Sequence, residues 1–366
     1  MKPKGLLFAA SLLAIPCLHV AAQSSFPSPD AILYDSKHKE PKSGVELQGN
    51  AIIIRSGVGT PSTINALAFS RDNSLLVAGK DFGRVVIWRT ANGSFLRAID
   101  TGQGIVNAVA ISPDNQLIAT AGQQDQSILI WNVADGKLAR SIKIGNPPVH
   151  SLVFGLDGAT LVGAENGPFT FVFDASTGSE VAKYPGEWSP VISADDRTMI
   201  TTLKDRIIVR DTQSWKVQKE LPRPTKSAGP LALDTHADSY IYGDPFDDHS
   251  FVSVRLSTGE LYASQRFGKL PKWNPSEGGF AAFDPGSGLV FGHSGGRLWV
   301  WNVQDGRTCT SQILYSESGS LSSDGSMMAG GLDNSIMAAD KARPGVALWR
   351  TSTILKACGM QTQSTR

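Results

Sequence analysis

Residues 64–99 read INALAFSRDNSLLVAGKDFGRVVIWRTANGSFLRAI, and residues 106–142 read VNAVAISPDNQLIATAGQQDQSILIWNVADGKLARSI. Both stretches contain a short apolar run, a polar turn, two further apolar runs of which the last ends in Trp, and a fourth, more polar run. Weaker copies follow, with first turns at 157–158, 195–196, 237–238, 285–286 and 324–325. Seven units are therefore visible, and the six intervals from Asp72 to Asp324 span 252 residues, a mean of 42.

A period of this size, built from short and separate strands, is typical of a β-propeller in which each unit forms one blade. Residues 75–78 and 85–88 are nearly continuous apolar runs, as expected for strands that neighbouring blades cover on both faces. Polar turn residues such as Asn92-Gly93 separate the runs. No segment sustains a helical period. We therefore expect an all-β fold, a seven-bladed β-propeller of four-stranded antiparallel blades.

In its period and turn chemistry the chain resembles the WD-repeat (WD40-like) β-propeller family over roughly residues 64–358. The position of the family's Trp is occupied by Trp88, Trp131, Trp301, Trp349, Phe173, Arg210 and Arg255. The family's Gly-His pair is missing before the first strand of each unit, so the resemblance implies a weakened Asp-His-Ser-Trp hydrogen-bond relay. The turns at 174–178 and 256–259 also look like those of quinoprotein-like propellers.

The first 22 residues have the pattern of a signal peptide. Lys2 and Lys4 precede the apolar run 5–15, and Val20-Ala21-Ala22 supplies small residues for cleavage before Gln23. The run is too short to cross a bilayer, which takes about 20 residues. We therefore expect an extracytoplasmic protein, periplasmic or secreted, without a membrane span. Lipidation of Cys17 is the alternative, although Pro16 sits where that cleavage needs a small residue.

The rest of the chain divides into three parts. Residues 23–50, with several Pro, Ser and Lys, are expected to form an extended N-terminal segment. The propeller then occupies residues 51–359, and residues 360–366 form a polar tail. An open sheet edge invites aggregation, so we expect residues 51–56 to close the ring as an outer strand of the last blade, next to or in place of residues 354–357.

Charge and cysteine content narrow the partners and the compartment. Without the leader, 32 basic residues face 33 acidic ones, so the sequence lacks the basic excess of a nucleic-acid-binding protein. The mature chain keeps Cys309 and Cys358, both expected in outermost strands of adjacent units. In an oxidising compartment they could form a disulfide between the last two blades. Two separate half-buried thiols are the alternative, because spacing alone does not place two sulfurs within reach.

Three connections are longer than the fold requires: residues 243–250, 267–279 and 330–345, all in blades five to seven. They open onto one face of a propeller, and such loops are disproportionately functional. We expect a partner-binding surface there, with two aromatic anchors and a charged rim. Its residues are Phe246, Asp247, Asp248, His249, Lys269, Lys272, Trp273 and Arg343. The alternative is neutral insertion, with Trp273 filling a gap between blades.

The sequence contains no local catalytic motif, and the carboxylates beside His249 fit no calcium-loop spacing. We therefore expect no metal, no cofactor and no catalysis. The favoured function is an exported, monomeric scaffold that binds a protein or peptide partner. The alternative is a propeller enzyme, lactonase-like or quinoprotein-like, that acts on a small molecule at the central channel. Three or more carboxylates and imidazoles that converge on the axis would favour the enzyme.

Overall fold

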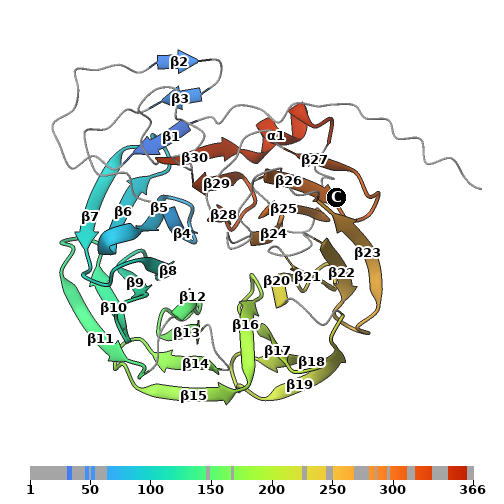
Figure 1. The fold of residues 1–366 in the computed structure, drawn as a ribbon, viewed down its shortest axis with the longest axis horizontal. Helices are drawn as coiled ribbons and strands as arrows, with labels where there is room; N and C mark the ends of the chain where they lie inside the picture. The colour runs from blue at the N-terminus through green and yellow to red at the C-terminus, as the bar shows by residue number, and fades with distance from the viewer. Residues whose placement is uncertain are drawn as a thin grey trace, which may run out of the picture.

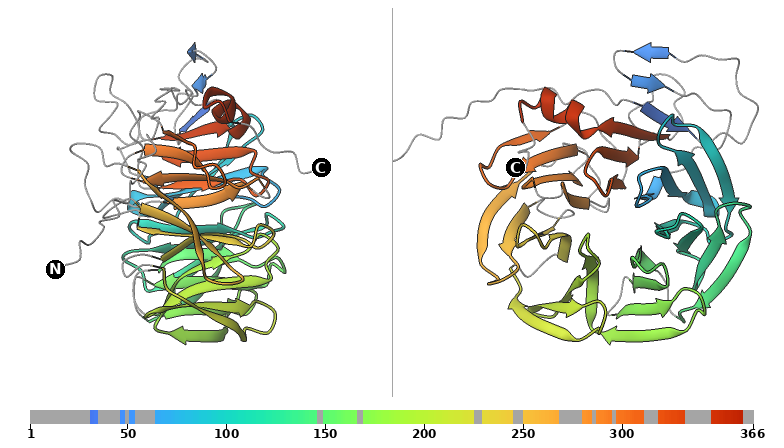
Figure 2. Two further views of the ribbon diagram at one scale, coloured as in Figure 1. Left: turned by 90° about the vertical axis from the view of Figure 1, so that its right-hand side faces the viewer. Right: turned by 180° about the vertical axis from the view of Figure 1, so that it is seen from behind.

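Seven β-sheets stand around a central axis in the computed structural model and form a closed disc (Figure 1). Seen from the side, the disc is flat (Figure 2). The structure describes residues 31–34, 46–48, 51–53, 64–145, 149–165, 169–224, 229–244, 250–267, 280–284, 287–294, 297–310, 318–331 and 345–360. The predicted seven-bladed, almost entirely β propeller is confirmed.

Each of the first six blades has four antiparallel strands in chain order, and the first of them lies nearest the axis. Blades one to three contain β4 (Ile64–Phe69), β5 (Leu75–Lys80), β6 (Arg84–Arg89), β7 (Phe95–Asp100), β8 (Val106–Ile111), β9 (Leu117–Gly122), β10 (Ser127–Asn132), β11 (Leu138–Lys143), β12 (Val149–Phe154), β13 (Thr160–Glu165), β14 (Phe169–Asp174) and β15 (Glu180–Pro185). Blades four to six contain β16 (Glu187–Ile192), β17 (Thr198–Leu203), β18 (Arg206–Asp211), β19 (Val217–Pro222), β20 (Gly229–Asp234), β21 (Ser239–Asp244), β22 (Ser250–Arg255), β23 (Leu261–Arg266), β24 (Phe280–Asp284), β25 (Leu289–Ser294), β26 (Arg297–Asn302) and β27 (Thr308–Thr310).

The core lies between neighbouring blades rather than within any one of them. All six residues of β5 are buried, whereas the outer strand β11 buries only one of its six. Val77 and Ile87 of blade one pack in one cluster with Ile118 and Trp131 of blade two. Each fully buried aliphatic side chain of this kind contributes about 1.5–3 kcal/mol relative to exposure. The continuous apolar runs therefore reflect burial on both faces of each inner sheet.

The turn between the first and second strands follows a repeated Ser-x-Asp pattern. In four blades the Ser hydroxyl donates a hydrogen bond to the Asp carboxylate and accepts one from the backbone N–H five residues beyond the Ser. The Ser and Asp pairs are Ser70 with Asp72, Ser112 with Asp114, Ser193 with Asp195, and Ser322 with Asp324. These polar residues satisfy backbone groups that the hairpin leaves unpaired.

The same turns also connect one blade with another. Asn115 of blade two donates to the Asp72 carboxylate at 2.8 Å, and the Ser323 N–H of blade seven donates to Asn73 at 3.0 Å. The Arg71 guanidinium reaches from blade one to the Ala194 carbonyl of blade four at 3.0 Å. The turns therefore join blades that are far apart in the sequence.

The ring is closed by a strand from the beginning of the chain. Blade seven contains β28 (Gly319–Leu321), β29 (Met327–Gly331), β30 (Gly345–Arg350) and, as its fourth antiparallel strand, β1 (Ala31–Tyr34). Residues 51–56 were predicted to close the ring as an outer strand of this blade; some of them do join its sheet, but the strand that pairs with β30 is β1. β3 (Ala51–Ile53) lies one strand further out, parallel to β1, and β2 (Glu46–Gln48) lies beyond it. A four-residue apolar run is too short to reveal a strand by its periodicity.

After β30 the chain forms a short helix, α1 (Thr351–Ala357), where we expected an outer strand. Because β1 already pairs with β30, the following residues have no sheet edge to join. Ile354 and Leu355 of α1 instead pack against Phe291 and Leu298 of blade six. No helix in the described part of the chain is long and apolar enough to cross a membrane.

A disulfide between Cys309 of β27 and Cys358 joins the end of α1 to blade six, with their Cα atoms 5.7 Å apart. Beside it, the Arg307 guanidinium donates a hydrogen bond to the Gly359 carbonyl at 3.2 Å. Cys309 is buried. The last two blades are therefore linked both by packing and by a covalent bond.

Candidate functional site

The face of interest is the one that carries the connections from second to third strands and from each blade to the next; we call it the loop face. The turn at residues 81–83 and the connection at residues 101–104 lie together there, because Gly83 N–H donates to the Gly104 carbonyl. All eight predicted partner-binding residues lie outside the described residues: Phe246, Asp247, Asp248, His249, Lys269, Lys272, Trp273 and Arg343. The geometry of the loop face is therefore known from its other, described residues.

In blade two a buried polar relay crosses the sheet beneath this face. The Trp131 indole N–H donates to the Thr120 hydroxyl at 2.9 Å, and that hydroxyl donates to Gln103 Oε1 at 2.6 Å. Gln103 Nε2 then donates to the Ser127 carbonyl at 3.0 Å. Gln103 therefore occupies the place of the missing histidine, and a relay is present in this blade through Gln103, Thr120 and Trp131. In the sequence, only the flanking Gly102 and Gly104 could have marked Gln103 as a residue with a structural role.

In blade four an ion pair takes the place of the neutral relay. Arg210 occupies the Trp position, as predicted, and donates two hydrogen bonds to the Glu187 carboxylate, one of them at 3.2 Å. The Thr201 hydroxyl donates to the same carboxylate at 2.7 Å. The side chains of Arg210 and Glu187 are only 10% and 5% exposed. The guanidinium also lies 4.0 Å from the centre of the Tyr184 ring, a favourable cation–π contact.

Blade five uses a third arrangement. Arg223, in the connection before the blade, donates to the hydroxyl of the buried Tyr242 and to the Lys204 carbonyl at 2.9 Å. Its guanidinium lies 5.3 Å from the Trp188 ring. Burial raises the pKa of Tyr242, while the hydrogen bond and charge of Arg223 oppose that rise. These contacts fix an aromatic and a basic side chain at the loop face between blades four and five.

The assignment of Arg255 to the Trp position of blade five was wrong. The bulge that pairs Trp131 with Leu138 in blade two pairs Val254 with Leu261 in blade five. Val254 is buried, whereas Arg255 is exposed and lies 4.7 Å from the Tyr262 ring. The buried position is therefore aliphatic in this blade.

Phe82 is the most exposed large apolar side chain among the described residues, at 75%. It lies in η1 (Asp81–Gly83), the connection between the second and third strands of blade one, and its φ of 59° and ψ of 29° are left-handed. Side chains with a Cβ adopt this conformation at a cost of about 1–2 kcal/mol. Asn65 donates to the Asp81 carboxylate at 2.9 Å, and Thr101 donates twice to the Gly83 carbonyl. These bonds hold the turn in its strained form.

The enzyme alternative depends on which titratable side chains lie near the central channel. His150 lies inside β12, as predicted, and its side chain is exposed. Among the described residues there is no group of three or more His, Cys, Asp or Glu side chains that could hold a metal ion. At the other ends of the inner strands, burial raises the pKa of Asp284, and the nearby carboxylates of Asp324 and Asp234 raise it further. The enzyme alternative therefore stays a prediction.

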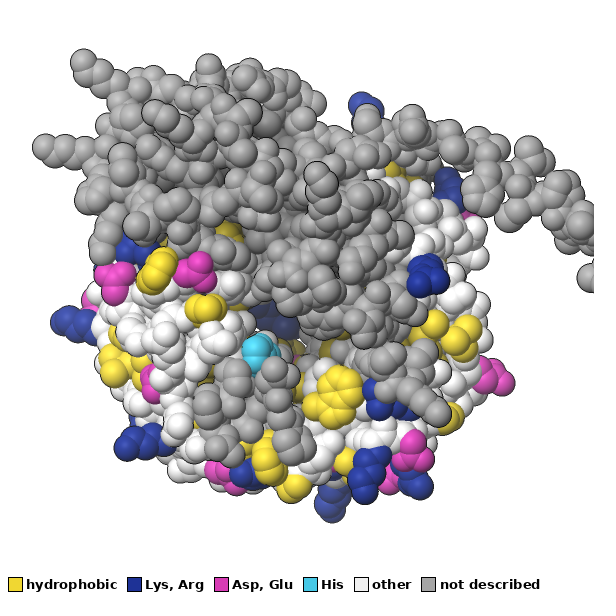
Figure 3. Space-filling view, in the orientation of Figure 1, with side chains coloured by type: hydrophobic (Ala, Val, Ile, Leu, Met, Phe, Trp, Pro, Cys, Tyr) yellow, Lys and Arg dark blue, Asp and Glu magenta, His cyan; other side chains and the backbone are white. Residues whose placement is uncertain are grey.

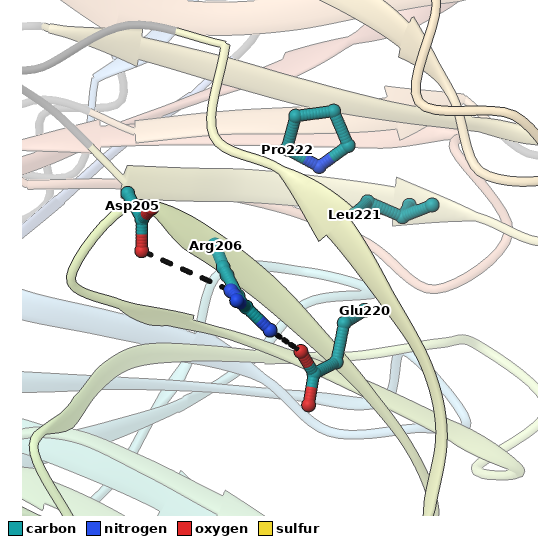
Figure 4. Close-up of a pocket in the computed structure, with 5 residues that line it drawn as sticks. All are labelled: Asp205, Arg206, Glu220, Leu221 and Pro222. Carbon is teal, nitrogen blue, oxygen red and sulfur yellow. Dashed lines mark hydrogen bonds and ion pairs between the residues drawn. The ribbon is translucent and has the colours of Figure 1, made fainter.

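A shallow depression of about 270 Å³ lies on blade four (Figure 4). Arg206 lies between Asp205, 3.9 Å away, and Glu220, with which it forms a direct ion pair. Leu221 and Pro222 complete the lining. The charged groups satisfy one another and are largely exposed, so we assign no ligand to this depression.

Comparison with known proteins supports the repeat assignment. Residues 93–132 match the family model for the WD domain, G-beta repeat. Among solved structures the chain is similar to that of U3-55K and to that of the RRP9 WD40 repeats, each at 17% identity and a TM-score of 0.63. Both similarities cover 80% of this chain, and 97% and 96% of those chains. At this identity they show the fold alone. No curated protein matches the sequence.

Proposed function

We propose that this chain, a divergent WD40-like β-propeller, is an exported, non-catalytic scaffold that binds a protein or peptide partner on its loop face. The architecture carries this proposal, because WD40 propellers typically serve as platforms for protein interaction. A rigid ring that presents loops from several blades on one face suits such a role. In this chain, buried relays hold those connections in blades two, four and five.

The surface proposed for the partner is the sector of blades five to seven. The described strands bracket its three long connections: β21 ends at Asp244 before β22, β23 ends at Arg266 before β24, and β29 ends at Gly331 before β30. Connections at these places in a blade open onto the loop face, and the proposal assigns all three to it. Phe246 and Trp273 would supply apolar anchors, and the neighbouring Lys, Arg and Asp residues a polar rim.

Export is proposed from the leader pattern of residues 1–22 and is supported by the disulfide between Cys309 and Cys358. Disulfides persist in oxidising compartments and are rare in reducing ones. Mass spectrometry of the protein isolated from its native source tests this directly. A mature chain that begins at Gln23 with both cysteines oxidised is expected, whereas an intact N-terminus with free thiols would contradict export.

A protein rather than a nucleic acid is proposed as the partner, and the scaffold is proposed to be a monomer. Lys and Arg side chains alternate with Asp and Glu along the visible rim of the disc (Figure 3). Nucleic-acid-binding surfaces instead show basic side chains gathered in a patch or stripe. The near balance of basic and acidic residues in the mature chain agrees with this choice.

The experiment is affinity capture in the native compartment with three forms of the protein: wild type, F246A/W273A, and V181A/L261A. Val181 and Leu261 are exposed apolar side chains on outer strands, so the second variant is a control for general loss of apolar surface. We expect the same partner with wild type and control, and its loss with F246A/W273A. Equal capture of the partner by all three forms would contradict the assignment of the binding surface to Phe246 and Trp273.

A further inference from the structure

Phe82 is not explained by the packing of the propeller. Its side chain belongs to none of the buried clusters formed by the described residues, and it remains three-quarters exposed on the loop face. In blade two the residue with the same spacing before the Trp is Asp125, which accepts a hydrogen bond from the Ser127 hydroxyl within its own turn. That connection has four residues between its strands, against three in blade one, and an aromatic ring is not common to the two.

The turn that carries Phe82 is nevertheless held firmly. Gly83 has a φ of 70°, and an added Cβ would lie 2.9 Å from Gly102 N and 3.0 Å from Gln103 N. Thr101 N–H and its hydroxyl donate to the Gly83 carbonyl at 2.6 and 2.8 Å. A bulky residue in the left-handed region persists only where its surroundings enforce it, and such positions gather at binding sites.

Carboxylates lie on the turns and the connection next to the turn of Phe82. The turns of Asp81 and Asp125 both pack on the connection between blades one and two, because Gly83 N–H bonds to the Gly104 carbonyl and Gln124 N–H to the Gln103 carbonyl at 3.2 Å. Asp100 begins that connection and pairs with Arg84 at 2.8 Å, while Lys80 is buried. Figure 3 shows acidic side chains beside exposed hydrophobic ones over this part of the disc.

We infer that Phe82 is an anchor for a linear peptide segment of a partner protein, in which an apolar side chain covers the ring and a neighbouring Lys or Arg faces the carboxylates. An exposed aromatic ring attracts both groups, the first by burial and the second by a cation–π contact. This inference rests on the proposed function and adds the chemistry of the bound segment. Blade one adjoins blade seven through β4 and β28, so Phe82 lies one blade away from the sector proposed for the partner.

The test uses a phage-displayed library of random twelve-residue peptides, selected on the immobilised wild-type protein. The affinity of the selected peptides is then measured for F82N and for L261N, which also replaces an exposed apolar side chain by Asn, but on an outer strand. We expect peptides that combine an apolar residue with Lys or Arg, at least tenfold weaker binding to F82N, and unchanged binding to L261N.

The folding of F82N separates a binding role from a structural one. Asn adopts the left-handed conformation more readily than Phe, so F82N should melt at or above the wild-type temperature while it loses the peptides. Equal binding by wild type and F82N, or a lower melting temperature for F82N than for L261N, would overturn the inference.

Two further outcomes separate this inference from the proposed function. Peptides that no longer bind F246A/W273A but still bind F82N would contradict the role of Phe82 and support the proposed surface in blades five to seven. Selection of no peptide by the wild-type protein would also overturn the inference, while a surface for a folded partner would remain.

Discussion

The buried ion pair of blade four offers the sharpest test of how this propeller is held together. Glu187 accepts hydrogen bonds from Arg210 and Thr201, and both charged side chains are at least nine-tenths buried. Changing Glu187 to Gln keeps the size and an oxygen for Thr201 but leaves the Arg210 charge without a counter-ion. Removing one partner of a buried pair costs about 3–5 kcal/mol. We therefore expect E187Q to lower the free energy of unfolding by about 3 kcal/mol or more.

The assay is equilibrium unfolding in urea followed by tryptophan fluorescence. With an m-value of about 3 kcal/mol/M, that loss lowers the midpoint by about 1 M. The matched control is E220Q, because Glu220 pairs with Arg206 in the same blade but the two side chains are 45% and 58% exposed. An exposed pair contributes at most about 1 kcal/mol, or about 0.3 M at the midpoint.

A second pair of variants tests whether the loss comes from the unpaired charge. E187Q/R210W supplies the three side-chain types of the relay in blade two, with the Gln on the first residue of β16 and not in the preceding connection. E187Q/R210M offers a flexible apolar side chain if Trp does not fit. We expect at least one of them to recover more than about 1 kcal/mol relative to E187Q, the coupling of residues in direct contact. An E187Q midpoint no lower than that of E220Q would refute the reasoning.

Three further predictions concern other parts of the ring. C309S/C358S should lower the free energy of unfolding by about 2–4 kcal/mol, and a reducing agent should lower the melting temperature of the wild type but not of this variant. Q103A should lower the free energy of unfolding by about 1–3 kcal/mol, because it leaves the buried Thr120 hydroxyl without its acceptor. Q103H should recover part of that loss. Equal destabilisation by both variants would contradict the role of Gln103 in the relay. Hydrogen bonds from the Ser112 hydroxyl and the Gln116 N–H hold the pKa of Asp114 below its usual value near 4. The contribution of Asp114 to stability is therefore full above pH 4 and is lost as the pH falls below it. D114N should reduce the fall of the unfolding midpoint below about pH 5, and an unchanged pH dependence would contradict this role.

The architecture could be predicted from the sequence because its signal is repeated. Seven polar turns at a mean spacing of 42 residues, with continuous apolar runs between them, follow directly from strands buried between neighbouring blades. In blade four, Arg210 was correctly predicted to occupy the position of the family's Trp, because Asp211 directly after it marks the start of the next turn. It was wrong in blade five, where the bulge before Val254 shifts the register by one residue and no feature of the sequence marks the shift.

The closing elements and the relays could not be predicted in the same way. β1 has four residues and α1 seven, so neither is long enough for a period to be recognised. Gln103 and Glu187 act through partners in strands 17 and 14 residues further along the chain, and only the folded structure shows which polar residue faces which. Residues 93–132, which match the family model, contain the relay with Thr120 and Trp131, so the family's sequence signature is retained where the relay still uses its usual hydroxyl and indole.

The pairing of β1 with β30 determines the order in which this protein can reach its native state. Ala31 pairs with Leu348, so β1 can pair with β3 early but cannot complete blade seven until β30 has been synthesised. Such distant pairing makes completion of blade seven a late and slow event in folding. Until then the edge of β30 remains open to strands from other molecules. Nascent or truncated forms of the chain should therefore aggregate, and the full-length protein should become soluble only when its two ends meet.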